Sequence, residues 1–342
     1  MPLTRAPLHP KFTVLVPCLN EEESLPHFFE AVIPALERCA GNDWTILVVD
    51  DGSTDGTFDL VVARHTSDPR VSIISLSRKF GHQAAITAGL AYVNSDYVAI
   101  MDADLQYPPQ IMEKLYAKVA EEGFDICLGV RGSRQAPWFL NMAYKTFYRL
   151  MKGLSDHPWP VDAGDFSVFN RTVHQALLRL PENDRMLRGL RSWVGFKSAA
   201  ITYERPARGH GQAKYNFWRL LALAVSALVG FTTAPLRLAS IIGFGMSLLT
   251  LLVGFLFLLN RLIPSFSLFG YHVGANAGTA TILLYFSFVS SMLFFCLGII
   301  GEYLVVLVRE AKRRPCAIVA RQTAGLTAQS ASSQVFTPDR ES

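Results

Sequence analysis

Several common signatures are missing from this 342-residue chain, and each absence excludes a class of function. No Gly-x-Gly-x-x-Gly follows the first apolar run, and no Gly-x-x-x-x-Gly-Lys-Ser/Thr occurs anywhere. These absences argue against dinucleotide-dependent redox enzymes and P-loop NTPases. The net charge is only +4, and no basic stripe with interleaved aromatic residues occurs. Nucleic acid is therefore not an expected partner.

Paired cysteines and an N-terminal leader are missing as well. The five cysteines are Cys18, Cys39, Cys127, Cys296 and Cys316. They show neither metal-ligand spacing nor a paired pattern, so we expect reduced thiols in a cytosolic or membrane environment. Residues 1–11 contain no apolar core, so no signal peptide is expected, and a soluble first domain would stay on the side where it is made.

Charged residues nearly vanish after residue 216. Hydrophobic residues make up 50% of the chain and the mean hydropathy is +0.25, which is more apolar than an ordinary soluble protein. Residues 238–260 form an uncharged stretch of 23 residues between Arg237 and Arg261, and residues 278–301 form a second uncharged stretch. Each exceeds the ~20 residues that cross a bilayer, so we predict two transmembrane helices rather than two buried core helices.

The basic residues around these stretches predict the orientation. The loop at 261–277 holds one Arg and no Lys, whereas Arg309, Lys312, Arg313 and Arg314 follow the second stretch. The positive-inside rule places the C-terminal tail in the cytoplasm. Two spans return the chain to its starting side. We therefore expect a protein of the cell (inner) membrane with two spans, whose first domain and both termini are cytoplasmic.

The composition divides the chain into four parts. Residues 216–231 are mostly aromatic and aliphatic with Arg219 as the only charge, which predicts an interfacial helix lying along the membrane. Residues 320–342 are rich in Ser, Thr, Gln and Ala, which predicts disorder. The predicted parts are a cytoplasmic domain (1–215), a juxtamembrane amphipathic helix (216–234), a two-helix transmembrane domain (235–308) and a basic, then disordered, cytoplasmic tail (309–342).

In the first domain, short apolar runs alternate with helical patterns. Strands are predicted at 12–17, 44–49, 71–76, 97–101, 124–130 and 198–203, and helices near 21–36, 82–93 and 108–122. The first of these helices is expected to carry Glu21–Glu23 in its first turn. The alternation is typical of right-handed βαβ units, so we predict an α/β fold with a doubly wound, mostly parallel sheet.

Acidic side chains follow two of the predicted strands. Asp50 and Asp51 end the second strand, and Asp102 and Asp104 end the fourth, one residue apart. Open α/β sheets bind ligands at this edge, where Asp50 or Asp51 could accept a hydrogen bond from a base imide or a ribose hydroxyl. Two close carboxylates repel unless a cation lies between them, and such ligands suit Mg²⁺ or Mn²⁺, which favour phosphate oxygens. The pair thus predicts a metal–diphosphate site, with a solvated acidic turn as the alternative.

Other polar residues complete the predicted site. Gln106 could be a neutral oxygen ligand, and Arg131 at the end of the fifth strand could neutralise a phosphate. Asp165 is a candidate general base or orienting group, with a helix N-cap or turn acid as the alternative. Arg208 and Lys214 lie in a Gly-rich basic loop that could grip a second anion, delivered from the membrane side.

Seven short motifs in this order resemble the inverting family 2 glycosyltransferases with a GT-A fold. More narrowly they resemble the polyprenyl-phosphate glycosyltransferases, such as bactoprenol glucosyltransferase and dolichyl-phosphate mannose synthase, over about residues 12–315. The motifs are Val16-Pro17-x-x-Asn20-Glu21, Val49-Asp50-Asp51-Gly52-Ser53-x-Asp55, Arg78-Lys79-x-Gly81, Asp102-Ala103-Asp104-Leu105-Gln106-x-Pro108, Gly164-Asp165-Phe166, Arg208-x-x-Gly211-x-x-Lys214-Tyr215 and Gly301-Glu302-Tyr303.

The resemblance implies a role for each candidate residue. The nucleotide sugar would be bound by Pro17, Leu19, Glu21, Asp50, Asp51, Asp102, Ala103 and Arg131. Mg²⁺ or Mn²⁺ would be bound by Asp102, Asp104 and Gln106, the catalytic residues would be Asp104 and Asp165, and the acceptor phosphate would meet Arg208 and Lys214.

The implied reaction is inverting transfer of a sugar from a nucleotide sugar to polyprenyl (undecaprenyl) phosphate, for modification of cell-envelope glycans. UDP-glucose is the expected donor, with UDP-galactose, UDP-N-acetyl sugars and GDP-mannose as alternatives. The resemblance also allows a homo-oligomer.

Two positions depart from the family pattern. Ser167 stands where the family has Arg after Gly-Asp-Phe, and Ala213 stands where it has Ser before Lys-Tyr. Both lie near segments that would handle phosphate, so the sugar and the acceptor contacts stay open.

Two rival functions are weighed against this one. A processive polysaccharide synthase would need more membrane helices and a Gln-x-x-Arg-Trp motif, which residues 190–193 do not match. An inactive nucleotide-sugar-binding membrane scaffold is disfavoured because all the predicted metal-site carboxylates are present.

Overall fold

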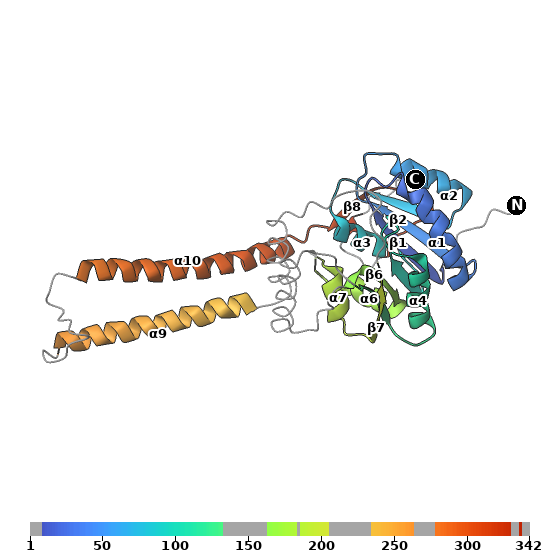
Figure 1. The fold of residues 1–342 in the computed structure, drawn as a ribbon. Coiled ribbons are helices and arrows are strands. Elements are labelled where there is room, and N and C mark those ends of the chain that lie inside the picture. The colour runs from blue at the N-terminus through green and yellow to red at the C-terminus, as the bar shows by residue number, and fades with distance from the viewer. Residues whose placement is uncertain are drawn as a thin grey trace. The chain divides into compact units, whose positions relative to one another are not determined.

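A computed structural model of the chain describes residues 9–132, 163–182, 185–204, 234–262, 278–329 and 335–336. These residues fall into two compact units. One is an α/β unit that includes the chain after residue 311, and the other contains two long helices (Figure 1). The C-terminal end of the chain therefore belongs to the same unit as its N-terminal half.

The described part of the α/β unit is built on one nine-stranded sheet with the order β7-β5-β6-β4-β1-β2-β3-β8-β9. The strands are β1 (Phe12–Cys18), β2 (Trp44–Asp50), β3 (Val71–Leu76), β4 (Tyr97–Ile100), β5 (Ile126–Arg131), β6 (Ala163–Asn170), β7 (Ser198–Tyr203), β8 (Ala317–Gln322) and β9 (Val335–Phe336). All six predicted strands are present, with bounds that differ by one or two residues.

The centre of the sheet is parallel, and two antiparallel strands make the sheet mixed. β4, β1, β2 and β3 are parallel neighbours, as the alternating pattern predicts. β6 runs antiparallel between β4 and β5, and β8 runs antiparallel to β3. The prediction of an α/β fold with a mostly parallel sheet is confirmed, while these two strand directions were not predicted.

Three of the described helices in this unit, at 24–40, 82–90 and 109–120, correspond to the predicted ones. The described helices of the unit are α1 (Ser24–Ala40), α2 (Thr57–Ser67), α3 (His82–Leu90), α4 (Pro109–Ala120), α6 (Arg171–Arg179) and α7 (Leu187–Trp193). The expectation that Glu21–Glu23 fill the first turn of α1 is wrong, because α1 begins at Ser24. The Glu22 carboxylate instead accepts a hydrogen bond of 2.8 Å from the backbone N–H of Gly56, so it supports the loop before α2.

Helices cover both faces of the sheet, since alternate residues of a strand point to opposite faces. Val14 and Val16 of β1 belong to the buried core with α1 and α4. Leu15 points to the other face, where it packs on α3 at Gly89. A Cβ at Gly89 would lie only 2.2 Å from the Leu15 Cδ1 and 2.7 Å from the Val49 Cγ2. Glycine therefore allows α3 to lie close to β1 and β2.

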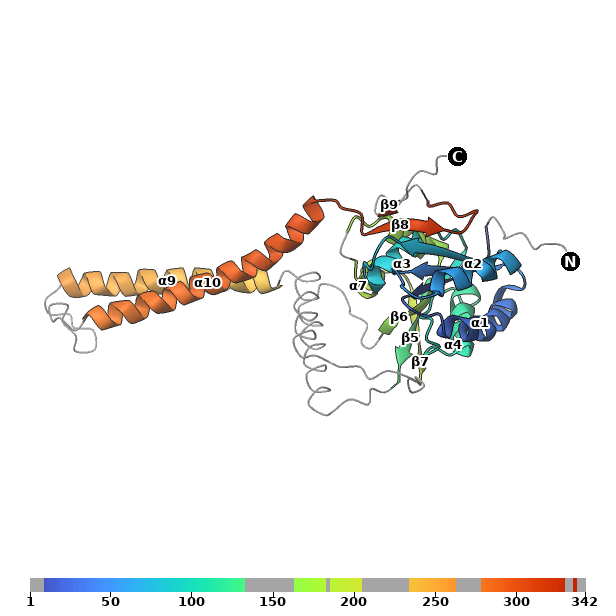
Figure 2. The same cartoon turned by 90° about the horizontal axis from the view of Figure 1, so that it is seen from above.

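The described part of the C-terminal tail, which continues to residue 329, contradicts the prediction of disorder from residue 320. β8 pairs with the edge of β3 (Figure 2). The N–H of Thr323 donates to the Ile73 carbonyl at 3.0 Å, and the N–H of Gln329 donates to the Ala91 carbonyl at 2.7 Å. Composition predicted this segment poorly because β8 needs little apolar surface. Its backbone bonds β3, and only alternate residues at its start, such as Val319, are buried.

A chain that ends at Arg314 is expected to lose about 2 kcal/mol or more of stability in the α/β unit. The truncation exposes the edge of β3 and removes the buried Val319, whose burial alone stabilises by roughly 1.5–3 kcal/mol. Denaturant unfolding and hydrogen exchange of the β3 amides would measure the loss. Truncation after Gln329 is the control, and equal stability of the two truncated chains would contradict a structural role for β8.

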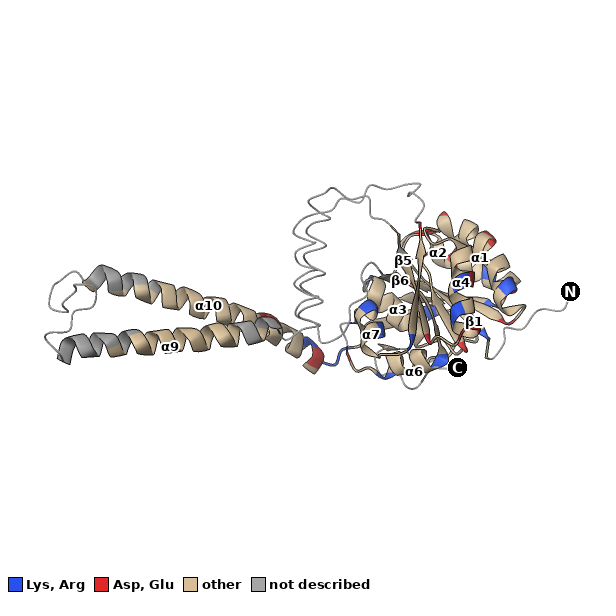
Figure 3. Ribbon diagram, turned by 60° about the horizontal axis from the view of Figure 1, so that its bottom comes forward, with Lys and Arg blue, Asp and Glu red and all other residues tan. Residues whose placement is uncertain are grey.

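The second unit contains α9 (Ala234–Leu262) and α10 (Gly278–Ala311). The Tyr285 hydroxyl donates to the Thr250 hydroxyl at 2.7 Å, which joins the two helices. Figure 3 shows the described parts of both helices almost without charge, with acidic residues only towards the C-terminal end of α10.

Among the described residues, one helical segment is long and apolar enough to cross a membrane. It is Phe288–Ala311, with 24 residues, a mean hydropathy of 2.2 and no burial within the chain. Ala239–Leu252 of α9 is a shorter apolar helix. One membrane helix is thus supported by length and composition, and the second predicted span stays a prediction. The predicted interfacial helix lies outside the described residues, except for Ala234, which begins α9.

Candidate active site

A pocket of about 280 Å³ opens at the carboxyl edge of the sheet, just beyond β1, β2 and β4. Because these strands are parallel and in register, with Cys18 opposite Asp50, their carboxyl ends meet at one edge. The pocket is lined by Pro17, Cys18, Leu19, Glu21, Asp51, Lys79, His82, Ala85, Asp102, Ala103 and Asp104. Seven of these residues are predicted site residues, so folding brings most of the predicted donor site together.

Three described residues of the predicted site do not line the pocket, and the side chains of three others lie outside the described part of the chain. Asp50, Gln106 and Asp165 lie in the α/β unit with their side chains buried. Arg131 ends β5, but its side chain is outside the described part of the chain. Arg208 and Lys214 are also outside the described residues, so the anion grip predicted for them stays a prediction.

Asp50 and Asp51 have different environments although they are adjacent. Asp50 is completely buried, and its carboxylate accepts hydrogen bonds from the Ser53 N–H at 2.8 Å and the Ser75 hydroxyl at 2.7 Å. Asp51 lines the pocket and accepts from the backbone N–H groups of Phe80 and Gly81 at 2.7 and 2.9 Å. Asp50 therefore shapes the turn after β2, and Asp51 is the better placed of the two to meet a nucleotide.

Gly52 lets two loops approach closely at this pocket. It has φ +78°, and a Cβ there would lie 2.7 Å from the Arg78 backbone carbon and 2.9 Å from the Lys79 nitrogen. The loop after β2 is thereby held against the loop before α3. This approach allows Asp51 to bond that loop and places Lys79 in the pocket wall.

Gly52→Ala is expected to destabilise the α/β unit by about 2 kcal/mol or more and to weaken nucleotide binding. The added Cβ would push the two loops apart. The energy of this clash adds to the roughly 1–2 kcal/mol that an alanine loses in a left-handed backbone conformation. Gly123→Ala is the matched control, because Gly123 has φ +71° with open space around it. Denaturant unfolding and calorimetric titration with UDP would compare the two, and equal effects would contradict the close approach.

Asp102 and Asp104 form an acidic pair in the pocket wall, with Glu21 nearby. Burial raises the pKa of Asp102, and the charges of Asp104 and Asp165 add to this, against the opposing influence of His82. Burial also raises the pKa of Glu21, with the charges of Asp104 and Asp102 contributing. Carboxylates that are crowded in this way would be stabilised by a bound cation.

The residues present fit a divalent cation for which a bound diphosphate and water supply most of the coordinating oxygens. The amide oxygen of Gln106 is buried without a hydrogen-bond partner, which is consistent with an oxygen that awaits a ligand. No group of three or more acidic, His or Cys side chains able to hold a metal occurs among the described residues. Asp102 and Asp104 would therefore share the ion with diphosphate oxygens and water, which is how Mg²⁺ is usually bound.

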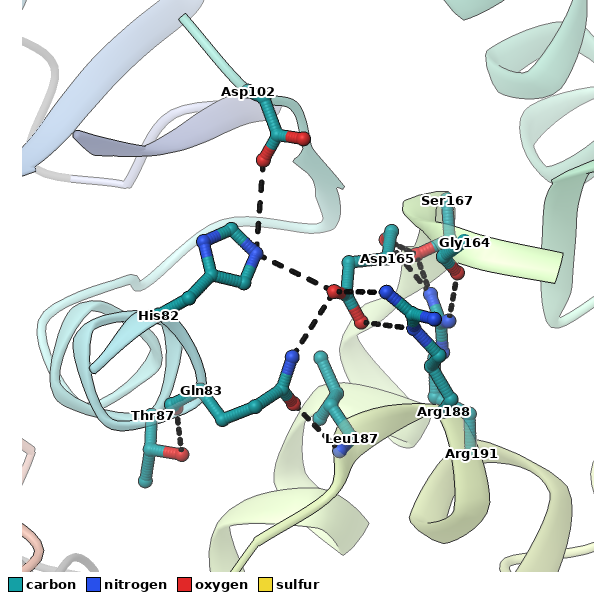
Figure 4. A network of polar contacts seen from close by, with 10 residues as sticks. All are labelled: His82, Gln83, Thr87, Asp102, Gly164, Asp165, Ser167, Leu187, Arg188 and Arg191. Atoms are coloured by element: carbon teal, nitrogen blue, oxygen red, sulfur yellow. Dashed lines mark hydrogen bonds and ion pairs between the residues drawn. The ribbon is translucent and has the colours of Figure 1, made fainter. Parts of the chain in front are cut away.

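Asp165 on β6 is the centre of a polar network beside this pair (Figure 4). Its carboxylate accepts hydrogen bonds from the Arg188 Nη2 at 3.1 Å and the Gln83 Nε2 at 3.0 Å. The His82 Nε2 lies 3.3 Å from Asp165 and 3.7 Å from an oxygen of Asp102. His82 thus connects the buried acid to the pocket wall.

The charges around Asp165 bear on its two predicted roles, general base and orienting group. Burial by itself would raise the pKa of Asp165, but the hydrogen bond with His82 and the charge of Arg188 outweigh burial and hold the pKa well below its usual range. Such a carboxylate stays ionised and is a weak proton acceptor at neutral pH. The geometry favours an orienting group over a general base.

Sequence reasoning missed three residues of this region. Lys79 lies within the motif Arg78-Lys79-x-Gly81, and His82 follows that motif at the start of α3. The motif pointed to this segment, but it did not indicate a role for either side chain. Arg188 comes from α7, a short helix with no motif of its own. Only the tertiary structure brings Arg188 to Asp165.

Comparison with known proteins identifies the family. The family model described as glycosyl transferase family 2 matches residues 13–178, and a glycosyltransferase of Bacillus subtilis is 35% identical over 92% of this chain and 94% of its own length. The chain belongs to glycosyl transferase family 2. It is accordingly a glycosyltransferase, and the resemblance read from its motifs is confirmed.

Other similar proteins have more specific names. A prophage bactoprenol glucosyl transferase homologue of Escherichia coli is 31% identical over 91% of this chain and 99% of its own length. A solved structure of glucosyl-3-phosphoglycerate synthase from Mycobacterium tuberculosis is 19% identical, with a TM-score of 0.45 over 64% of this chain and 78% of that one.

Proposed function

We propose that this family 2 glycosyltransferase moves a hexose, with UDP-glucose as the expected donor, to polyprenyl (undecaprenyl) phosphate at the membrane. The observation that carries the proposal is the similarity, over nearly the full length of both chains, to proteins named bactoprenol glucosyl transferase. The pocket supports it, because it combines an acidic pair with Lys79 at the edge where open α/β sheets bind nucleotides.

The donor would lie in the pocket with its diphosphate towards the acidic pair. Asp51, Glu21 and the backbone near Pro17 would face the nucleoside, and Lys79 would contact a phosphate as a point charge. Asp102, Asp104 and Gln106 would hold Mg²⁺ or Mn²⁺, which when bound stabilises the negative charge on the departing diphosphate.

Transfer would need little proton chemistry from the protein. A phosphate oxygen of the acceptor attacks C1 of the sugar, the new C1–O bond forms, and the C1–O bond to the donor diphosphate breaks. The nucleoside diphosphate leaves with the electron pair, and the configuration at C1 inverts. Because the attacking phosphate is already ionised at neutral pH, no base must remove a proton, which agrees with an Asp165 that is held ionised.

The membrane helices would bring the lipid acceptor to this chemistry. We infer two spans, formed by α9 and α10, with the α/β unit and both termini in the cytoplasm. The apolar length of α10 and the basic residues Lys312, Arg313 and Arg314 after it support this orientation. Arg208 and Lys214 are the proposed contacts of the acceptor phosphate.

Label transfer from a panel of nucleotide sugars tests the proposal. Membranes containing the chain are incubated with undecaprenyl phosphate and radiolabelled UDP-glucose, UDP-galactose, UDP-N-acetylglucosamine or GDP-mannose, with Mn²⁺, Mg²⁺ or a chelator. One donor giving an acid-labile lipid product that needs the cation supports the proposal. A long polymer would indicate a processive synthase, and nucleotide binding without transfer would indicate an inactive scaffold.

A further inference from the structure

The loop between β3 and α3, residues 77–81, places Lys79 in the wall of the donor pocket. The end of this loop is held by the Asp51 carboxylate, which accepts hydrogen bonds from the N–H groups of Phe80 and Gly81. The beginning of the loop is held by a part of the chain that is distant in sequence, the C-terminal tail. Lys79 therefore lies between two attachment points that different segments provide.

Strand β8 bonds the backbone just before Lys79. The Ser77 N–H donates to the Ile318 carbonyl at 2.9 Å, and Leu76 at the end of β3 pairs with Val319. Ser77 comes only two residues before Lys79 in the chain. The position of β8 therefore fixes the point at which the Lys79 loop leaves the sheet.

The tail is attached on both sides of the segment that contains this loop and α3. Before the loop, the Ile73 N–H donates to the Thr323 hydroxyl at 3.1 Å, and Val319 is only 2% exposed. After α3, the Gln329 side-chain amide donates to the Val93 carbonyl. β8 also contacts α3 itself (Figure 2). The tail thus bonds both ends of a segment that lines the pocket.

We propose that β8 is a positioning element for Lys79, and that the docked tail sets how tightly the pocket binds the phosphates of a nucleotide. An ammonium attracts a phosphate oxygen as a point charge, and this attraction weakens as the distance grows. Without the Ser77 contact, the loop would lose its first attachment point, and Lys79 would lose its fixed place beside the diphosphate. Pro17 and Glu21 belong to β1 and the loop after it, so the nucleoside end of the site would keep its contacts.

The inference deepens the proposed function and rests on it, because it assumes a nucleoside diphosphate in this pocket. β8 follows the apolar helix α10 after residues 312–316. The strand that positions Lys79 is therefore the first element of the tail after that helix.

Two neighbouring substitutions in β8 test the proposal in the full-length chain. Val319→Asp places a carboxylate in a buried position and should detach the strand, whereas Ala320→Asp places the same charge in an exposed one. Calorimetry compares the binding of UDP and of uridine, each with Mn²⁺, per folded protein. We expect Val319→Asp to weaken UDP binding about tenfold and uridine binding less than about threefold, because only UDP offers a phosphate to Lys79. Ala320→Asp should change neither affinity.

Lys79→Met separates positioning from a general loss of stability. In that background the phosphate contact is already missing, so the addition of Val319→Asp should weaken UDP binding less than about twofold further. A general loosening of the pocket would add its full effect in both backgrounds. Equal losses in the two backgrounds, equal losses for UDP and uridine, or an unchanged UDP affinity in Val319→Asp would each overturn the proposal.

The chain that ends at Arg314 is the second variant, because it lacks β8 altogether, and the chain that ends at Gln329 is its control. The shorter chain should show the same selective loss of UDP affinity, and the longer one should not. If neither Val319→Asp nor the chain that ends at Arg314 folds, the proposal fails, because β8 would then be needed for the fold itself and not for the placement of one loop.

The parent protein distinguishes this inference from the proposed function. A parent that binds UDP but transfers sugar to undecaprenyl phosphate from none of the donors would remove the proposed function, while the effect of β8 would still be scored by binding. A parent that binds UDP no more tightly than uridine would overturn the inference, whether or not transfer is observed.

Discussion

Replacing Asp104 with asparagine is expected to reduce sugar transfer by about three orders of magnitude, which corresponds to roughly 4 kcal/mol of transition-state stabilisation. Asp104 lies in the pocket wall next to Asp102, where the cation would be held. The change removes one charge from the acidic pair but keeps an oxygen that can accept the hydrogen bond from the Gln106 N–H, which is 3.1 Å long. The fold should therefore survive while cation binding is lost.

Loss of the Asp104 charge should also affect the unfolding free energy. The charge of Asp104 contributes to the raised pKa of Asp102, so Asp104→Asn should leave the unfolding free energy equal or slightly higher in chelator. Steady-state transfer rates and Mn²⁺-dependent UDP binding would be measured in parallel. Asp59→Asn, on the exposed surface of α2, is the control for loss of a carboxylate. Full activity of Asp104→Asn would rule out the metal assignment.

Asp165→Asn is expected to destabilise the α/β unit by about 3 kcal/mol and to lower transfer strongly. Removing one partner of a buried ion pair costs roughly 3–5 kcal/mol, and the lower end applies because Arg188 is 45% exposed and can be solvated. Asp68→Asn is the matched control: it breaks the Arg70 pair, with an Nη2–Oδ2 distance of 2.9 Å, away from the pocket. Loss of stability is expected in both variants, and loss of kcat only in Asp165→Asn.

The stability difference between the parent and Asp165→Asn should depend on pH with a definite sign. The lowered pKa of Asp165 stabilises the fold above the unfolded value of about 4, and this stabilisation is lost as the pH falls through the folded pKa. Burial alone would lower the pKa of His82, but the bond to Asp165 and the charge of Asp102 raise it.

His82 therefore adds stability below about pH 6.5, which disappears as the pH rises through its folded pKa. The difference between the two proteins should be largest between about pH 4 and 6.5. Denaturant titrations in chelator would measure it. A difference that grows steadily above pH 7 would contradict the His82–Asp165 contact.

Local patterns determined much of the fold and the acidic half of the site. A buried parallel strand is a short apolar run, so β1 to β5 could be found from residues close in sequence. Acids directly after such runs must lie at one edge of a parallel sheet, which is why Asp51, Asp102 and Asp104 were predicted to meet. The motifs around them sufficed to recognise the family.

The tertiary structure decided what depends on partners distant in sequence. Asp50 and Asp51 carry the same chemistry, and only their surroundings make one a turn acid and the other a pocket residue. The composition from residue 320 onwards predicts disorder, yet residues up to Gln322 belong to strand β8, because the open edge of β3 offers backbone partners that composition does not reveal.

The surroundings of Asp165 likewise depended on the tertiary structure. Two arginines of α7 surround Asp165, and they lie more than twenty residues further along the chain. Sequence alone therefore determined the sheet, the acidic pair, the apolar stretches and the family, because periodicity and strand ends are local properties. Which acid is held ionised and which edge the tail covers were decided by packing, because contact partners are set only when elements distant in sequence meet.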